Sequence, residues 1–396
     1  MDTALAGRHC CLQPTSLQSW FVQSQVLSVC KPRCSVPFKV TATLSASSVT
    51  LNVGRRQLLA GFAAMTAGAN QLESNLQPAS ETEMQSSIIP ADLNYASSGP
   101  FRVARLPRIE HTCHKLFPQC LGTQCLLRLD IFCPKGGSSF GAAPPYPLAI
   151  FTGGFLVGSG AYVSYAERLA SWGYVTVLYD KAETAVDNLD DVISVKFIQE
   201  IMDWCGSHPV VSRVSDFSRV YLCGHSRGGK LSVLAAAVDP RVVALCLLDP
   251  VDNTVWAPLG PGYPSAIQAL KLLGSKQTIE GTAGVPLALV GSGLGGDCAP
   301  KAANFRLFYE ACTAPSWMVS VEQAGHFQFL DKQSSMQRAV CAQGRLPDYS
   351  VRQLSQAVMV AWAQATIPLN RDGSEQVRTR SMATRTCLKP SLQRLC

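Results

Sequence analysis

The stretch Val220–Lys230, VYLCGHSRGGK, decides the fold of this chain. Its first residues are β-branched, aromatic or apolar and predict a buried strand. The apolar run LSVLAAAV at Leu231–Val238 predicts a helix. Ser226 lies on the turn between them, where Gly224 and Gly228 leave room for a strained backbone. A serine raised on such a strand–turn–helix unit is typical of a catalytic nucleophile.

Gly-x-Ser-x-Gly in this context is the nucleophile turn of the α/β-hydrolase fold. From about residue 99 onward, strand and helix patterns alternate. Predicted strands span 125–132, 147–151, 174–179, 219–223, 242–248, 286–290 and 317–321, and predicted helices span 162–171, 189–205, 231–238 and 351–365. We therefore expect one α/β-hydrolase domain over residues 99–369, with a mostly parallel central sheet flanked by helices.

The composition argues against a nucleic-acid-binding protein. Hydrophobic residues make up 47% and charged residues only 15% of the 396-residue chain, although the net charge is +7. Lysines and arginines outnumber acids mainly before residue 73 and after residue 370, so the predicted domain is close to neutral. No basic patch characteristic of nucleic-acid binding is visible in it.

The N-terminus has the composition of a targeting segment. Residues 1–54 are rich in serine and threonine, and almost without acids, as in a chloroplast transit peptide. Arg55-Arg56 and a short apolar run to Ala69 then resemble a twin-arginine signal, although a single long transit peptide is the alternative. We predict a targeting region over 1–69, a polar lead-in over 70–98 and a basic disordered tail over 370–396. The expected location is the chloroplast, in the thylakoid lumen or at the thylakoid membrane surface.

Sixteen cysteines are many for a chain of this size. The spacing of Cys113, Cys120, Cys125 and Cys133 does not match a zinc finger or ribbon. In an oxidising compartment we expect a disulfide within this group, or one between Cys298 and Cys312.

A serine nucleophile needs a base within hydrogen-bond reach, and the base needs an acid that orients it. In this fold both partners follow the serine in the chain, and the acid precedes the histidine. His326 is the one histidine downstream of Ser226 and follows the last predicted strand, so it is the predicted base.

Three aspartates are candidates for the acid. Asp249 ends the strand after the serine, Asp252 follows it closely, and Asp297 lies in the glycine-rich segment 291–297. Asp249 is favoured because a strand end holds a side chain more rigidly than a glycine-rich loop does.

The oxyanion formed during acyl transfer needs two backbone amides. One is predicted to come from Arg227, directly after the serine. The other is predicted to come from Phe155, because Gly153 and Gly154 allow the backbone to approach closely.

Several of these motifs together resemble those of the chlorophyllase family. The similar stretches are Gly224–Lys230, Asp249–Asp252, Gly291–Gly295, Cys298–Lys301, Phe308–Cys312 and Ala324–His326, with Leu330 and Asp331 shortly after. The resemblance covers about residues 148–331 and supports Asp249, since the family's acid lies in its Asp-Pro-Val element. One departure is Gly153-Gly154, where the family usually has His-Gly.

The resemblance implies a serine carboxylesterase that cleaves the phytyl ester of chlorophyll to chlorophyllide and phytol. It implies no cofactor or metal site, because the magnesium belongs to the substrate, and it leaves the oligomeric state open. An apolar groove for the phytyl chain is expected from Phe155, Leu156, Val157, Val255, Trp256 and Leu259. The alternatives are an esterase for pheophytin or other lipids and, in a different class, a non-catalytic pigment-binding protein.

Overall fold

A computed structural model describes residues 94–118, 125–137, 142–182, 189–280, 284–367 and 369, without the side chains of 276–280, and the backbone of 42–45 and 48–51. The last two segments are the strands β1 (Ala42–Ser45) and β2 (Ser48–Leu51), which pair antiparallel. Most of the predicted targeting region and lead-in, and the whole tail over 370–396, lie outside the described residues. Among the described helices, none combines the length and the apolar character that crossing a membrane requires.

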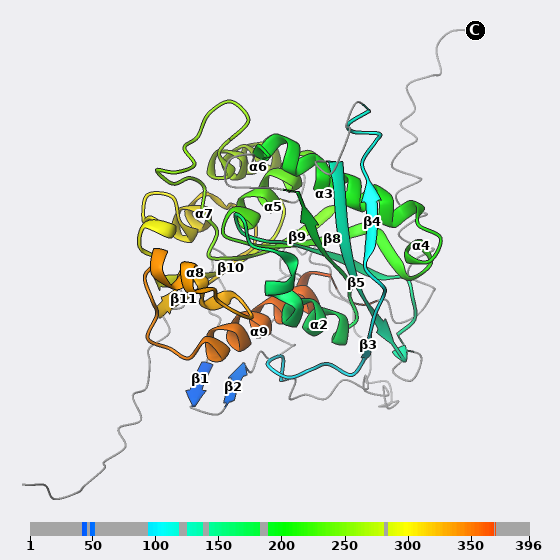
Figure 1. The fold of residues 1–396 in the computed structure, drawn as a ribbon, viewed down its shortest axis with the longest axis horizontal. Coiled ribbons are helices and arrows are strands. Elements are labelled where there is room, and N and C mark those ends of the chain that lie inside the picture. Colours follow the sequence, from blue (N-terminus) through cyan, green and yellow to red (C-terminus); the bar gives the residue numbers. More distant parts are fainter. Residues whose placement is uncertain are drawn as a thin grey trace, which may run out of the picture.

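The centre of the fold is a nine-stranded sheet in the order β11-β10-β9-β8-β6-β7-β5-β3, with β4 beside β5 (Figure 1). Neighbours from β11 to β7 run parallel, whereas β5 joins β7, β3 and β4 antiparallel. The strands are β3 (Arg102–Arg105), β4 (Ile109–Thr112), β5 (Leu126–Lys135), β6 (Tyr146–Thr152), β7 (Val175–Lys181), β8 (Ser215–His225), β9 (Val242–Leu248), β10 (Leu287–Leu294) and β11 (Ser316–Gly325). The mostly parallel sheet confirms the predicted α/β-hydrolase fold.

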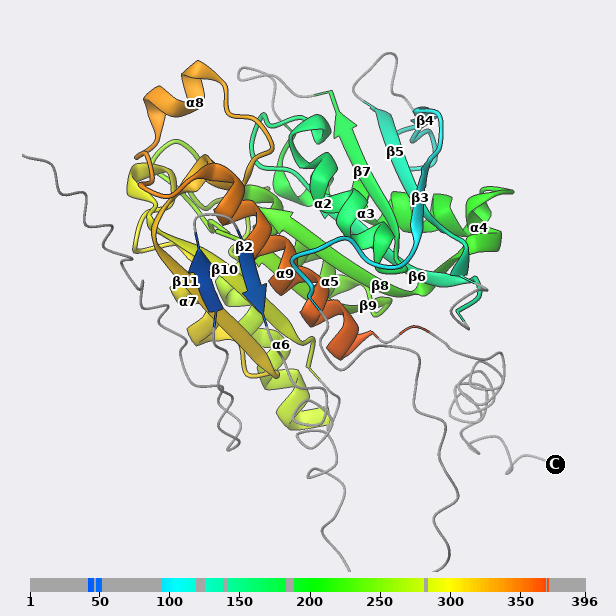
Figure 2. The same cartoon turned by 90° about the horizontal axis from the view of Figure 1, so that it is seen from below.

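Helices cover both faces of the sheet (Figure 2). One face carries α2 (Val163–Ser171) and α9 (Asp348–Thr366). The other carries α3 (Asp191–Ser207), α5 (Arg227–Val238), α6 (Ala266–Glu280) and α7 (Phe305–Ala311). Two short helices, α4 (Val211–Val214) and α8 (Ser335–Val340), lie in connections.

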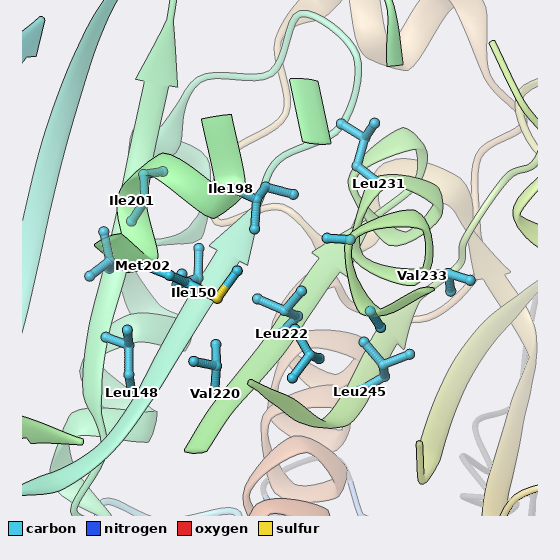
Figure 3. Packing of buried hydrophobic residues seen from close by; sticks show 14 of the residues in the cluster. Leu148, Ile150, Ile198, Ile201, Met202, Val220, Leu222, Leu231, Val233 and Leu245 are labelled. Atoms are coloured by element: carbon cyan, nitrogen blue, oxygen red, sulfur yellow. The ribbon is translucent and has the colours of Figure 1, made fainter. Parts of the chain in front are cut away.

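Strand periodicity divides the core into two layers, because successive side chains point to opposite faces of a sheet. In β6, Leu148 and Ile150 pack toward α3 and α5, beside Leu222 of β8 (Figure 3). Ala149 and Phe151 of the same strand pack toward α2 and α9. With both faces covered, the central strands are apolar throughout, which is why the sequence pattern identified them.

The sequence pattern gave no indication of α6, α7, β3 or β4. Gly274 in the middle of α6 lowers its helix propensity, and tertiary contacts supply the stability instead. The strands β3 and β4 have only four residues each, too few to show a reliable alternation.

Candidate active site

Ser226 occupies the sharp turn between β8 and α5. Its backbone has φ 56° and ψ −124°, a conformation that costs a non-glycine residue about 1–3 kcal/mol. The flanking glycines are required by packing. A Cβ on Gly224 would lie 2.3 Å from the carbonyl oxygen of Gly228, and one on Gly228 would lie 2.1 Å from that of Thr152. The close approach of β6, β8 and α5 therefore fixes the serine at the carboxyl end of the sheet.

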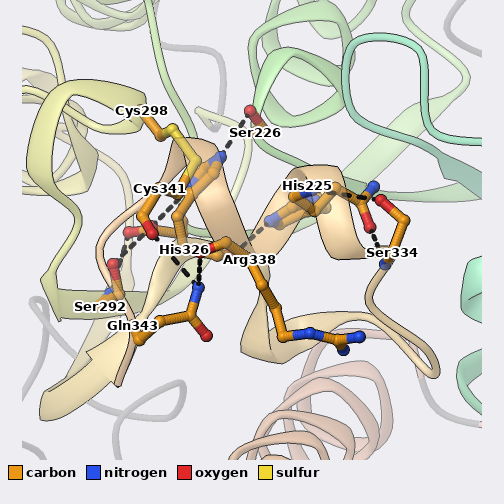
Figure 4. Close-up of a disulfide and its surroundings, with 11 residues drawn as sticks. His225, Ser226, Ser292, Cys298, His326, Ser334, Arg338, Cys341 and Gln343 are labelled. Carbon is orange, nitrogen blue, oxygen red and sulfur yellow. Dashed lines mark hydrogen bonds and ion pairs between the residues drawn. A yellow bond between two sulfur atoms is a disulfide. The ribbon is translucent and has the colours of Figure 1, made fainter.

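His326 begins the turn after β11, and one end of its imidazole faces Ser226 (Figure 4), while the other end contacts Asp249. Its Nε2 is 2.9 Å from Ser226 Oγ, and its Nδ1 is 2.7 Å from Asp249 Oδ2. The ring is buried. With Nδ1–H donating to the carboxylate, Nε2 is free to accept the serine proton, which is the arrangement of a general base.

Asp249 is fully buried at the end of β9, with a left-handed backbone of φ 43°. Ser292 of β10 holds its carboxylate: the backbone N–H donates to Oδ1 at 2.9 Å, and the hydroxyl donates to Oδ2 at 2.6 Å. These donors compensate a buried charge. Ser292 belongs to the Gly-Ser-Gly motif noted in the sequence, but only the parallel pairing of β9 with β10 shows which acid it supports.

The other two aspartates have different surroundings. Asp252 is buried and accepts hydrogen bonds from the Ser265 hydroxyl and the Ala266 amide, both at 2.6 Å, so it fixes the start of α6. Asp297 is exposed in a short 3-10 helix. The structure thus brings Asp249, rather than Asp252 or Asp297, into contact with His326.

The loop after β6 touches the nucleophile turn. A Cβ on Gly154 would lie 3.3 Å from Ser226 Cβ, so this backbone passes close to the serine. The Gly154 N–H donates to the Tyr162 hydroxyl at 3.0 Å, whereas the next amide, that of Phe155, has no hydrogen-bond partner among the described residues. Arg227 is the first residue of α5, so its amide belongs to the positive end of that helix.

The side chain of Arg227 joins this loop to α3. Its guanidinium carbon lies 5.7 Å from the centre of the Phe155 ring, and its Nε donates to Asp191 at 2.8 Å. Lys230 also pairs with Asp191, at 2.8 Å. The two residues predicted to supply oxyanion amides are therefore also in contact through their side chains.

His225, directly before the serine, has a role that the sequence reasoning missed. Its Nδ1 is 2.8 Å from the Tyr162 hydroxyl, and its Nε2 is 3.0 Å from the backbone carbonyl of His326. A carbonyl only accepts, so Nε2 carries the hydrogen and Nδ1 accepts from the tyrosine. This buried ring links the serine turn to His326 and, through Tyr162, to Gly154.

Burial is the main reason why the pKa of His225 is well below its usual 6.5, and the neighbouring His326 lowers it further. A neutral ring keeps one donor and one acceptor, as the network requires. Burial likewise raises the pKa of Tyr162, so its hydroxyl stays protonated.

A disulfide between Cys298 and Cys341 lies beside His326 (Figure 4). The expected pairing of Cys298 with Cys312 is wrong: Cys298 pairs with Cys341, and the buried Cys312 thiol, at the end of α7, contacts the Ala314 carbonyl at 3.7 Å. Ser292 is part of β10, and the disulfide joins the segment that follows this strand to the segment that follows His326. In the Cys113–Cys133 group, Cys125 is disulfide-bonded, whereas Cys113 and Cys133 are free.

Apolar side chains are exposed in two loops at the same edge of the sheet. Phe155 and Leu156 lie in the loop after β6, and Val255, Trp256 and Leu259 follow Asp249 in the chain. Trp256 is 87% exposed and Val255 is 83% exposed, which is unusual for large apolar residues.

The second loop lies against the start of α3. The carbonyl oxygen of Gly262 accepts hydrogen bonds from the Asp191 and Val192 amides. Asp191 in turn holds Arg227. The loop that carries Val255 and Trp256 is therefore anchored near Arg227, the residue that follows Ser226.

The mostly parallel sheet and the Ser–His–Asp geometry at its carboxyl edge define a protein of the α/β-hydrolase class. The family model for chlorophyllase matches residues 131–391, more than half of the chain, and the chain belongs to the chlorophyllase family. Chlorophyllase-2 of Arabidopsis thaliana is 29% identical over 207 residues, which cover 47% of this chain and 61% of that relative. Chlorophyllase-1 of the same plant is 26% identical over 252 residues, which cover 57% of this chain and 73% of that relative. The chain thus spans less than two thirds of Chlorophyllase-2.

Proposed function

We propose that this chain is a serine carboxylesterase that hydrolyses the phytyl ester of chlorophyll to chlorophyllide and phytol. The observation that carries the proposal is the line of hydrogen bonds from Ser226 Oγ through His326 to Asp249, in a member of the chlorophyllase family. The names of the two relatives support the substrate.

The reaction follows from the positions of these groups. Ser226 Oγ attacks the ester carbonyl while His326 Nε2 takes its proton, and Asp249 stabilises the imidazolium that forms. The amides of Phe155 and Arg227 donate to the oxyanion. The tetrahedral intermediate expels phytol, which receives the proton from His326. Water, deprotonated by the same histidine, then attacks the acyl-enzyme and releases chlorophyllide and free Ser226. No redox step occurs, and the magnesium stays in the chlorin ring.

His225 acts as a positioning residue in this scheme. Its imidazole is hydrogen-bonded to the backbone carbonyl of His326 and to the Tyr162 hydroxyl. Tyr162 in turn accepts from Gly154, in the loop that carries Phe155. His225 therefore fixes the base and one oxyanion donor relative to the serine between them, which lowers the reorganisation needed for reaction.

The exposed apolar loops are suited to an isoprenoid chain. Phe155 and Leu156 follow Gly154, whose backbone passes close to Ser226. The loop that carries Val255–Leu259 is hydrogen-bonded to the start of α3, where Asp191 binds Arg227. Burying such side chains against phytyl is favourable by about 25 cal/mol per Å² of apolar area. The same residues would contact lipid when the substrate is taken from a thylakoid membrane surface.

We also propose that the protein is located in the chloroplast and that residues 1–69 are its targeting region. Sequencing the N-terminus of the mature protein tests it. A start near Asn70 supports a transit peptide followed by a twin-arginine signal, and a start near Val40 supports a single transit peptide. An uncleaved Met1 in chloroplast-containing cells contradicts both.

The test of activity uses the purified full chain and its Ser226→Ala variant with chlorophyll a, pheophytin a and a short p-nitrophenyl ester. Chlorophyllide from the wild type alone supports the proposal. Hydrolysis of pheophytin or of the short ester, without chlorophyllide, indicates an esterase with another substrate. Absence of all three products, together with no labelling by a fluorophosphonate, favours a non-catalytic pigment-binding protein.

A further inference from the structure

Far along α3 from the catalytic array, three side chains of metal-binding type converge. His111 is in β4, Cys113 follows that strand, and Glu200 lies in the middle of α3. One imidazole nitrogen, the sulfur and one carboxylate oxygen all lie within 4.8 Å of one another. The His111 Nε2 and Glu200 Oε1 atoms are 2.8 Å apart.

The charge of Glu200 is poorly compensated. Its side chain is 9% exposed, and no lysine or arginine pairs with it in the described part of the chain. Elsewhere in the same domain, buried carboxylates have stronger partners: Asp191 has Arg227 and Lys230, and Asp249 has its serine donors. Among the described side chains, Glu200 has one hydrogen-bond partner, His111, which contacts a single carboxylate oxygen. A buried carboxylate with so few partners is unfavourable.

We propose that His111, Cys113 and Glu200 bind a divalent cation of the zinc type. Imidazole, thiolate and carboxylate are the three ligand types that zinc takes in proteins, and their usual bond lengths place ligand atoms about 3.3–3.8 Å apart around the ion. Small side-chain rotations bring the three atoms to that spacing: His111 Nε2 and Glu200 Oε1, 2.8 Å apart, separate slightly, and the longer distances in the cluster, up to 4.8 Å, shorten. The Cys113 thiol releases its proton to solvent as the sulfur binds, and the two anionic ligands then balance the charge of the ion.

The position indicates a structural role. The ion joins the segment after β4, at the antiparallel edge of the sheet, to α3, which covers the face of the parallel strands. The side chain of His111 is 20% exposed, so a water molecule can reach the fourth ligand position. The Trp204 ring, 6.0 Å from the imidazole between centroids, limits how far His111 can turn. The site takes no part in the proposed ester hydrolysis and is independent of it.

The test starts from the full chain after treatment with a chelator and its removal. Titration with Co²⁺ as the probe is expected to produce a thiolate-to-cobalt charge-transfer band that one equivalent of Zn²⁺ abolishes. Cys113→Ser should remove this band, and His111→Ala should weaken binding at least about tenfold. His114→Ala is the matched control, because His114 is exposed three residues from His111 and should leave the titration unchanged.

Thermal unfolding provides the second measurement. Zn²⁺ at about 100 times its dissociation constant should raise the Tm of the wild type by roughly 5–10 °C, but not that of Cys113→Ser. His111→Gln keeps a hydrogen-bond donor for Glu200 without an imidazole, so it separates loss of metal binding from loss of folding. A charge-transfer band that survives in Cys113→Ser, or a wild type that binds no Co²⁺, would overturn the proposal and leave an ion pair beside a buried thiol.

Discussion

The hydrogen-bonded residues around Ser226 and the exposed apolar residues of the loop after β9 lie at the same edge of the sheet but differ in their surroundings. Asp249 and His225 are fully buried, and each makes hydrogen bonds to a different strand or loop, whereas Val255 and Trp256 expose most of their surface. A buried hydrogen-bonded group cannot change without leaving partners unsatisfied. An exposed apolar loop can change with little cost to folding, so recognition of the substrate can vary while the reaction geometry stays fixed.

The largest effect in the buried region is expected from Asp249→Asn. The amide cannot balance the charge of the His326 imidazolium, and it favours the wrong tautomer, so kcat should fall by about 10,000-fold. Hydrolysis of the short ester by the purified variant measures this loss. Asp297→Asn, at an exposed aspartate outside the array, serves as control and should keep full activity; the reverse result would move the acid to Asp297.

The disulfide should stabilise the folded array more than it affects the chemistry. It closes a separation of 43 residues, for which chain entropy predicts about 4 kcal/mol of stability as an upper value. The double variant Cys298→Ala, Cys341→Ala should therefore lose roughly 10 °C in Tm. Reductant should lower the Tm of the wild type more than that of the double variant, which keeps only the disulfide of Cys125 among the described cysteines. An equal response of both would place the stabilising disulfide elsewhere.

His225→Phe tests whether the network behind the serine positions the base. Loss of both hydrogen bonds should reduce kcat roughly 10–100-fold with little change in KM. A higher KM with an unchanged kcat would contradict a positioning role.

The same variant has a pH signature. Because the folded pKa of His225 lies below 6.5, the unfolded chain takes up a proton there that the native state does not. Wild-type stability should thus fall as pH drops below about 6.5, by up to about 1.4 kcal/mol per pH unit from this group. Urea unfolding at pH 7.5 and 5.5 should show a smaller dependence for His225→Phe.

The smallest effect is expected in the exposed region, and only for the long substrate. Trp256→Ser removes apolar surface that would contact the phytyl chain, so kcat/KM for chlorophyll should fall roughly tenfold. Turnover of a short p-nitrophenyl ester and the Tm should remain as in the wild type. If both substrates are affected equally, the loop supports the catalytic array rather than the substrate.

Much of the fold could be predicted because it is encoded locally. The apolar runs of β6, β8 and β9 and the glycines around Ser226 follow from rules that apply within a few residues. The weakly patterned elements, α6, β3 and β4, were missed because tertiary packing rather than local propensity stabilises them.

The site shows the same division. The sequence identified Ser226, His326 and Asp249 as candidates from motif order and strand ends. It did not identify Ser292 or His225 as their partners, because these contacts join residues on different strands and loops. The expected pairing of Cys298 with Cys312 was also wrong, since spacing along the chain does not reveal that the segment carrying Cys341 folds back over Cys298.

By itself, the sequence determined the fold class, the nucleophile turn and the resemblance to chlorophyllases, since each depends on residue types at short separations. Only the tertiary structure decided which aspartate meets His326, how His225 connects His326 to Tyr162, and where Glu200 meets His111 and Cys113. Those contacts span between 63 and 101 positions in the chain. They exist because the parallel sheet brings distant strand ends and helix faces to one place, which no local pattern specifies.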